Sequence, residues 1–192
     1  LGPIQLTDLA NVYILQRDYD RVLKLAGRAL NLDPTFIHAY RHLVDAYFIL
    51  GETEQLVRTV EQIESLEDFP RQDLEILQIT RDLAQGLDER ANERIQHIAQ
   101  LAKAGQFSAV DVAHLAAMAG DFDLAGELLL QAYREKDGTW LWPHWVRLPE
   151  QAPDSEPWQA FWQQPGVAEL AKLRRSHGFT PSAPSFGSGG RQ

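Results

Sequence analysis

Apolar residues recur along this chain at the three- and four-residue spacings of amphipathic helices, and the patterned segments come in pairs. The first pair carries Leu6, Leu9, Ala10 and Tyr13, then Val22, Ala26 and Ala29. The second pair repeats the order with Tyr40, Leu43, Val44 and Tyr47, then Leu56, Val60 and Ile63. Such spacing is typical of helices that bury one face, whereas strands would alternate every second residue. The pattern predicts an all-α fold built from helical hairpins.

The turns between paired segments are themselves periodic. Arg17, Gly51, Gly86 and Gly120 follow one another at intervals of 34, 35 and 34 residues. Glycine suits such a turn because it tolerates positive φ, and Arg17 would fill the same place less well. An acidic residue follows three of these turns, at Asp18, Glu52 and Asp121. An Asp at that point can cap the next helix by accepting a backbone N–H.

The period predicts four helical hairpins over residues 1–138. Asp33-Pro34 should end the second helix of the first hairpin, since Pro cannot continue a helix. The third hairpin, about residues 70–106, is degenerate because the apolar positions of its first helix are shifted, and we expect an irregular helix crossing there. In the fourth hairpin, Ser108 and Asp111 resemble a capping box. Its second helix is expected from about Asp121 to Lys136.

These side chains resemble the tetratricopeptide repeat, in which a large residue, a large-small pair and an aromatic residue on the first helix meet small residues on the second. The resemblance implies a right-handed α-α superhelix whose concave groove binds a peptide or protein. The groove positions that it implies are Thr7, Asn11, Ile14, His38, Arg41, Asp45, Phe48, Val110, His114 and Ala117.

One subtype of that family grips chaperone C-termini with Lys, Asn and Arg at set positions of the first helices. The matching positions here are Thr7, Asn11, His42, Gln72 and Ile76. Only Asn11 agrees with the subtype, which argues against capture of a terminal carboxylate.

The composition changes after residue 138, because all five Trp fall between Trp140 and Trp162. We expect helices over about 139–147 and 155–163, the latter capped by Ser155, and a last helix opened by Pro165 and ending near Gly178. The block 139–179 is interpreted as a cap over the last repeat. The alternative is an aromatic ligand pocket, with Trp140, Trp142 and Trp145 as a secondary patch. Residues 180–192 have the composition of a disordered tail.

The order of residues 120–179 also resembles the end of tetratricopeptide sensor regions in bacterial signalling proteins. The stretch from Gly120-Asp121 through Tyr133-Arg134-Glu135 leads into Trp140, and then into Pro157-Trp158 and Gly178-Phe179. This resemblance implies a sensor region that follows an effector domain. The segment 149–156 is longer than the pattern of that family.

Charge and candidate chemistry narrow the function further. The net charge of −9 lacks the concentrated positive charge of nucleic-acid binding and disfavours anionic membranes. No Cys is present, and neither a phosphate-binding glycine loop nor a nucleophile elbow occurs. His38 and His42 share a helix face but lack a third ligand, so no metal or other cofactor is expected. An enzyme site involving His144 and Trp145 is the least favoured interpretation.

The sequence therefore predicts an interaction or sensor module of a larger bacterial protein, with a protein or peptide partner and no catalytic residues. The alternative is an adaptor or scaffold subunit of a secretion or envelope assembly. Because the chain begins at Leu1 without Met or a signal peptide, we expect a fragment from the cytoplasm or periplasm. Neither the compartment nor the oligomeric state is indicated.

Overall fold

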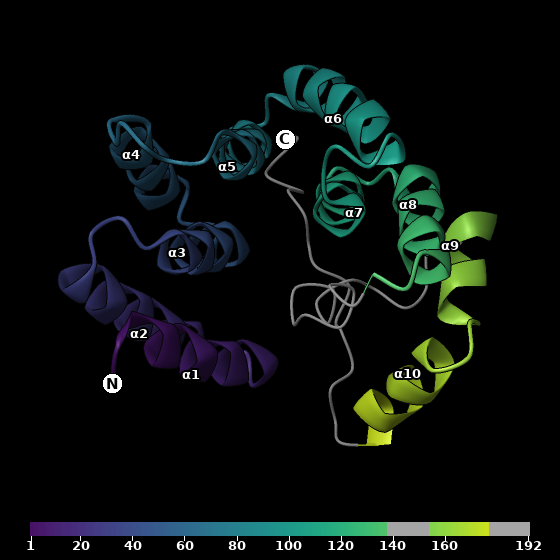
Figure 1. The fold of residues 1–192 in the computed structure, drawn as a ribbon, viewed down its shortest axis with the longest axis horizontal. Coiled ribbons are helices and arrows are strands. Elements are labelled where there is room, and N and C mark those ends of the chain that lie inside the picture. Colours follow the sequence, from purple (N-terminus) through teal and green to yellow (C-terminus); the bar gives the residue numbers. More distant parts are fainter. Residues whose placement is uncertain (138–153, 177–192) are drawn as a thin grey trace, which may run out of the picture. The chain divides into compact units, whose positions relative to one another are not determined.

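The computed structural model describes residues 1–137 and 154–176, and the chain divides into two compact units, Leu1–Leu87 and Asp88–Gln192. The described residues form ten α-helices and no strand, so the all-α prediction is confirmed (Figure 1). The boundary falls inside the hairpin that the sequence marks as degenerate. Each unit is therefore described separately below.

Unit 1 consists of five helices, each packed against the next. These are α1 (Pro3–Leu15), α2 (Tyr19–Leu32), α3 (Ile37–Leu50), α4 (Thr53–Glu64) and α5 (Arg71–Ala84). Helix α3 also contacts both α1 and α5, so these three helices form one layer, with α2 and α4 on the other side (Figure 1). Alternate helices therefore share a layer, as expected for consecutive hairpins.

The core of unit 1 is built from the apolar positions that repeat in the sequence. One cluster joins α1, α2 and the near side of α3, and its buried residues are Leu6, Ala10, Ile14, Val22, Leu25, Ala26, Ala29, Ala39 and Ala46. A second cluster joins α3, α4 and α5 through Tyr40, Val44, Leu56, Val60, Ile63 and Leu77. Small residues of one helix thus lie against large residues of its neighbour, which allows close helix crossings.

The periodic turns adopt the expected backbone conformation. Gly51 and Gly120 have φ values of 71° and 85°, and Arg17 takes φ 58° at the equivalent place. A side chain with a Cβ atom is strained in this left-handed region, which confirms that Arg17 performs the turn at a cost.

Short polar side chains cap the helices that follow those turns. The Asp18 carboxylate accepts the Arg21 backbone N–H, and Asp121 does the same for Leu124. Glu52, one methylene longer, makes no side-chain cap to α4. The predicted cap at Ser108 is confirmed, since its hydroxyl accepts the Asp111 N–H.

In unit 2 the described residues form two helical hairpins and one additional helix. The helices are α6 (Asp88–Lys103), α7 (Ala109–Met118), α8 (Phe122–Arg134), α9 (Glu156–Trp162) and α10 (Val167–Ser176). Helix α7 packs between α6 and α8, and α9 packs against α8 and α10. The predicted N-cap at Ser155 is confirmed, since its hydroxyl accepts the Trp158 N–H at 3.2 Å.

The start of the last helix differs from the prediction. Pro165 does not open α10, because Gly166 takes φ 84° and the helix begins only at Val167. The Pro165 carbonyl instead accepts a 2.9 Å hydrogen bond from the Tyr133 hydroxyl, which links the α9–α10 turn to α8. The helix predicted over 139–147 and the tail at 180–192 lie outside the described residues.

Helix α9 crosses α8 at a glycine. A Cβ atom on Gly126 would lie 2.2 Å from the Trp158 backbone nitrogen, so no larger residue fits without moving a helix. Trp158 and Phe161 are fully buried, and Phe122 meets Trp158 edge-to-face with ring centroids 5.2 Å apart. The described Trp residues therefore act as packing groups that cover α8, which agrees with the cap interpretation for this part of the block.

Candidate functional site

Four of the predicted partner-binding residues lie along one side of α3. His38, Arg41, Asp45 and Phe48 follow the three- and four-residue spacing that places side chains on a single helix face. His38 is exposed and the other three are partly exposed. This stripe mixes a cation, an anion and an aromatic ring, which suits a partner surface that is itself partly polar.

An ion pair joins this stripe to the neighbouring helix. Arg41 Nε lies 2.8 Å from Asp73 Oδ1 of α5, and the two side chains are only 20% and 23% exposed. The contact is an ion pair between the guanidinium of Arg41 and the carboxylate of Asp73. Limited exposure reduces solvent screening, and the pair fixes the Arg41 side chain between the two helices.

Asn11 extends the stripe onto α1. It stands 34 residues before Asp45 and is therefore its equivalent in the first hairpin. Its Oδ1 atom is buried and accepts no hydrogen bond from the described residues. The residue as a whole is partly exposed, so a rotation of its side-chain amide would bring a polar atom to the surface. We call Asn11, His38, Arg41, Asp45, Phe48 and Asp73 together the α1–α3–α5 face.

Two further predicted residues of unit 1 do not belong to this face. Thr7 is 4% exposed, and its hydroxyl donates to the carbonyls of Pro3 and Ile4 within the same helix. Ile14 is 3% exposed and belongs to the core cluster of α1, α2 and α3. Both side chains support the helix pair rather than a partner.

The predicted residues of the fourth hairpin lie on α7 in unit 2. Val110 and Ala117 are buried, while His114 is partly exposed. They are described within unit 2 alone and are not part of the α1–α3–α5 face. The secondary patch of Trp140, Trp142 and Trp145, and His144 with it, lies outside the described residues.

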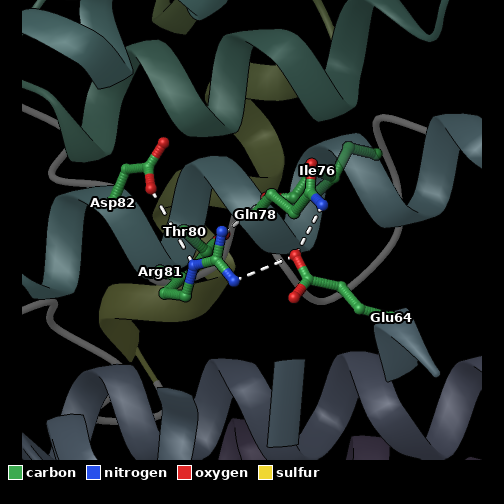
Figure 2. A network of polar contacts seen from close by, with 6 residues as sticks. All are labelled: Glu64, Ile76, Gln78, Thr80, Arg81 and Asp82. Carbon is green, nitrogen blue, oxygen red and sulfur yellow. Dashed lines mark hydrogen bonds and ion pairs between the residues drawn. The ribbon is translucent and has the colours of Figure 1, made fainter. Parts of the chain in front are cut away.

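A second polar network in unit 1 was not predicted from the sequence. The Glu64 carboxylate at the end of α4 accepts hydrogen bonds from Gln78 Nε2 at 2.6 Å and Arg81 Nη1 at 2.9 Å, both on α5 (Figure 2). Arg81 Nε also lies 3.9 Å from the carboxylate of Asp82, which is fully buried. The network holds α5, and with it Asp73, against α4.

The sequence offers a partial signal for this network. Asp82 lies among the apolar residues Leu77, Ile79 and Leu83 of α5. A carboxylate in such a pattern calls for a cationic neighbour, and Arg81 is adjacent in the chain. The partner Glu64 could not be predicted, because the shifted pattern of the third hairpin left the crossing of α4 and α5 undefined.

Two tyrosines behind the face have perturbed acidity. Burial raises the pKa of Tyr40, whose hydroxyl donates to the Pro34 carbonyl at 2.9 Å and accepts from Gln62 Nε2 at 3.2 Å. Burial, and to a smaller degree the negative charge of Glu52, raises the pKa of Tyr47. Both phenols therefore stay neutral near pH 7, and Tyr40 anchors the start of α3 to the α2–α3 loop and to α4.

The described residues can be compared with the requirements of a metal site and of a membrane-spanning helix. His42 is 4% exposed, whereas His38 is exposed, so the two predicted neighbours on α3 lie in different surroundings. Across residues 1–137 and 154–176, no group of three His, Asp or Glu side chains could hold a metal ion. Within the same ranges, no helix is long and apolar enough to span a bilayer.

Comparison with known proteins identifies no relative. No protein-family model, no curated protein and no solved structure matches the chain.

Proposed function

We propose that this chain is a tetratricopeptide-type interaction or sensor module that binds a peptide or protein segment along the α1–α3–α5 face. The observation that carries the proposal is the row of partly exposed polar groups on adjacent helices of one layer. Asn11, Arg41 and Asp45 contribute an amide, a cation and an anion to this row. Such a row can bind main-chain amides of an extended segment and also a charged side chain.

The chemistry of the face favours a partner that donates hydrogen bonds. The amide of Asn11 and the carboxylate of Asp45 can both accept hydrogen bonds, and Asp73 beside Arg41 offsets the positive charge of that side chain. Phe48 adds an apolar contact at the end of the α3 stripe. A partner segment with a basic or amide side chain followed by an apolar residue would complement the charge and polarity of this face.

The test is selection of binders from a random peptide display library on the wild-type chain. Selected peptides are then titrated against Asn11→Ala and Asp45→Ala, and the dissociation constant should rise at least about tenfold for each. Glu61→Ala is the matched control, because Glu61 is an exposed acidic residue of α4, in the other helix layer.

Circular dichroism should show unchanged helicity for all three variants. The proposal fails if no peptide is enriched, or if Glu61→Ala weakens binding as much as Asp45→Ala.

A further inference from the structure

One side of α1 leaves large apolar side chains in contact with solvent. Ile4, Leu9 and Val12 are 60%, 36% and 46% exposed, although α1 is the first helix of a hairpin. Asp8 is the only charged residue in this helix. A helix whose outer side is meant for water would carry more polar residues there.

The 34-residue period relates two of these exposed residues of α1 to equivalent positions on α3. Leu9 is equivalent to Leu43 of α3, and Val12 is equivalent to Ala46. On α3 these positions are packed into the core cluster that α1 and α2 form, and Ala46 is only 1% exposed. The same positions that hold α3 against the preceding hairpin are therefore open on α1.

Ile4 belongs to a different side of the helix. Its equivalent on α3 is His38, which is exposed even though α3 has a hairpin packed before it. The stacking positions of α1 can therefore be distinguished from residues that are merely apolar and exposed. Leu9 and Val12 belong to the first group, and Ile4 belongs to the second.

We propose that the Leu9–Val12 side of α1 is a stacking surface for the second helix of a further helical hairpin, placed on its amino-terminal side in the same polypeptide. The occupant should resemble α2, whose Ala26 and Ala29 give the small surface on which α3 packs, with Leu30 beside them. This surface is separate from the α1–α3–α5 face, so the proposal does not depend on the proposed function.

A second copy of the chain fits this surface less well. In a symmetric dimer, an antiparallel pair of α1 helices crossing at their centres would bring the two Asp8 carboxylates close together, and like charges there repel. A helix of the α2 type can instead offer a cation to Asp8, since α2 carries Arg21, Lys24 and Arg28 on its polar side.

The test adds one period to the full chain. A copy of residues 1–34 is placed directly before Leu1, which keeps the 34-residue spacing. A second version carries Leu23→Ala and Leu30→Ala in the copy. These smaller residues leave space for Val12 of the original α1, which is larger than the Ala46 at the equivalent position of α3. Hydrogen exchange of the original α1 amides should slow by at least about tenfold in at least one version. Val12→Lys in the original α1, and not in the copy, should abolish that protection. Ile4→Lys in the original α1 should leave the protection in place.

Two results would overturn the proposal. One is unchanged exchange of the α1 amides in both extended versions. The other is concentration-dependent dimerisation of the original chain in analytical ultracentrifugation, if Val12→Lys abolishes it, because the surface would then belong to a second copy. The effect of Val12→Lys on the original chain should be small, since Val12 is exposed there.

Discussion

The helix contacts of unit 1 and the α8–α9 crossing of unit 2 are made by different groups. In unit 1, polar groups bridge neighbouring helices in several places, through the Tyr40 hydroxyl, the Arg41–Asp73 pair and the Glu64 network. In unit 2, α9 is held on α8 chiefly by the edge-to-face contact of Phe122 with Trp158 and by a close backbone approach at Gly126, and the Tyr133 hydroxyl adds one hydrogen bond to the Pro165 carbonyl. The polar bridges of unit 1 depend on the protonation states of their side chains. The α8–α9 crossing depends on the side-chain volumes at the contact.

The largest expected effect is on the aromatic side of this comparison. Trp158→Ala should lower the free energy of unfolding of unit 2 by about 3–5 kcal/mol, because a fully buried ring is removed from between Phe122 and Trp162. Urea denaturation followed by circular dichroism measures the loss. Leu173→Ala is the control, since that side chain is 55% exposed and should cost less than about 0.5 kcal/mol. Equal losses in both variants would contradict the packing role of α9.

Substitution of two helical glycines by Ala distinguishes the effect of side-chain volume from the effect of helix propensity. Gly126→Ala should destabilise unit 2 by about 1–3 kcal/mol, because the new methyl group would overlap the backbone of α9. Gly27→Ala in α2 should instead stabilise unit 1 by about 0.5–1 kcal/mol, since the added carbon would meet no atom within 4 Å beyond its own helix backbone and chain neighbours. Thermal unfolding of the two variants measures the sign of each change in stability. A stabilising Gly126→Ala would mean that α9 does not cross α8 at this point.

The polar bridges of unit 1 should make it sensitive to alkali. The pKa of Tyr40 is raised in the folded chain, so the folded state keeps its proton at a pH where the unfolded state has lost it. The contribution of Tyr40 to the free energy of unfolding is therefore fully present below about pH 10, and it is lost as the pH rises through the pKa of Tyr40 in the folded chain. Tyr40→Phe should cost about 0.5–1.5 kcal/mol at pH 8 and reduce the further loss between pH 8 and 11.

A variant of a neighbouring residue tests the assignment of that alkaline loss. Glu52→Gln removes the negative charge that helps to raise the pKa of Tyr47, and it should recover only part of the loss. An alkaline profile that is the same for the wild type and Tyr40→Phe would contradict the role given to Tyr40.

The smallest effect concerns a feature that both units share. Arg17 in unit 1 and Lys136 in unit 2 each take φ 58°, a strained conformation for a residue with a Cβ atom. Replacing either with Gly should stabilise its unit by about 0.5–1 kcal/mol. Gln16→Gly is the control and should destabilise, because Gln16 has an ordinary helical conformation. Thermal melting of the three variants measures these changes. A lower melting temperature for Arg17→Gly would contradict the backbone strain assigned to Arg17.

The sequence predicted the parts of the fold that depend on local pattern. Helix caps at Asp18, Ser108 and Ser155 and the turn at Arg17 follow from side-chain and backbone chemistry within a few residues. The predicted start of α10 at Pro165 is wrong, because Gly166 takes a positive φ and separates Pro165 from the first residue of the helix. The division of the third hairpin between two units was not predicted either, although its irregular pattern was visible.

The candidate site was predictable only by analogy. Equivalence over 34 residues placed Asn11 and Asp45 together, and His38, Arg41 and Phe48 followed by helical spacing. The same projection also included Thr7 and Ile14, which are buried, because the family pattern fixes a helix face less finely than the packing of this chain does. The Arg41–Asp73 contact joins different helices and could not be inferred from spacing.

The most direct measurement of the proposed binding is hydrogen exchange of the full chain with and without a selected peptide at saturating concentration. Binding along the α1–α3–α5 face should slow exchange of amides in α1, α3 and α5, with α6 to α10 unchanged. The protection should be lost in the Asp45→Ala variant, which lacks one acceptor of the face. Protection confined to residues 88–176, or protection that survives in Asp45→Ala, would contradict the assignment of the partner to this face.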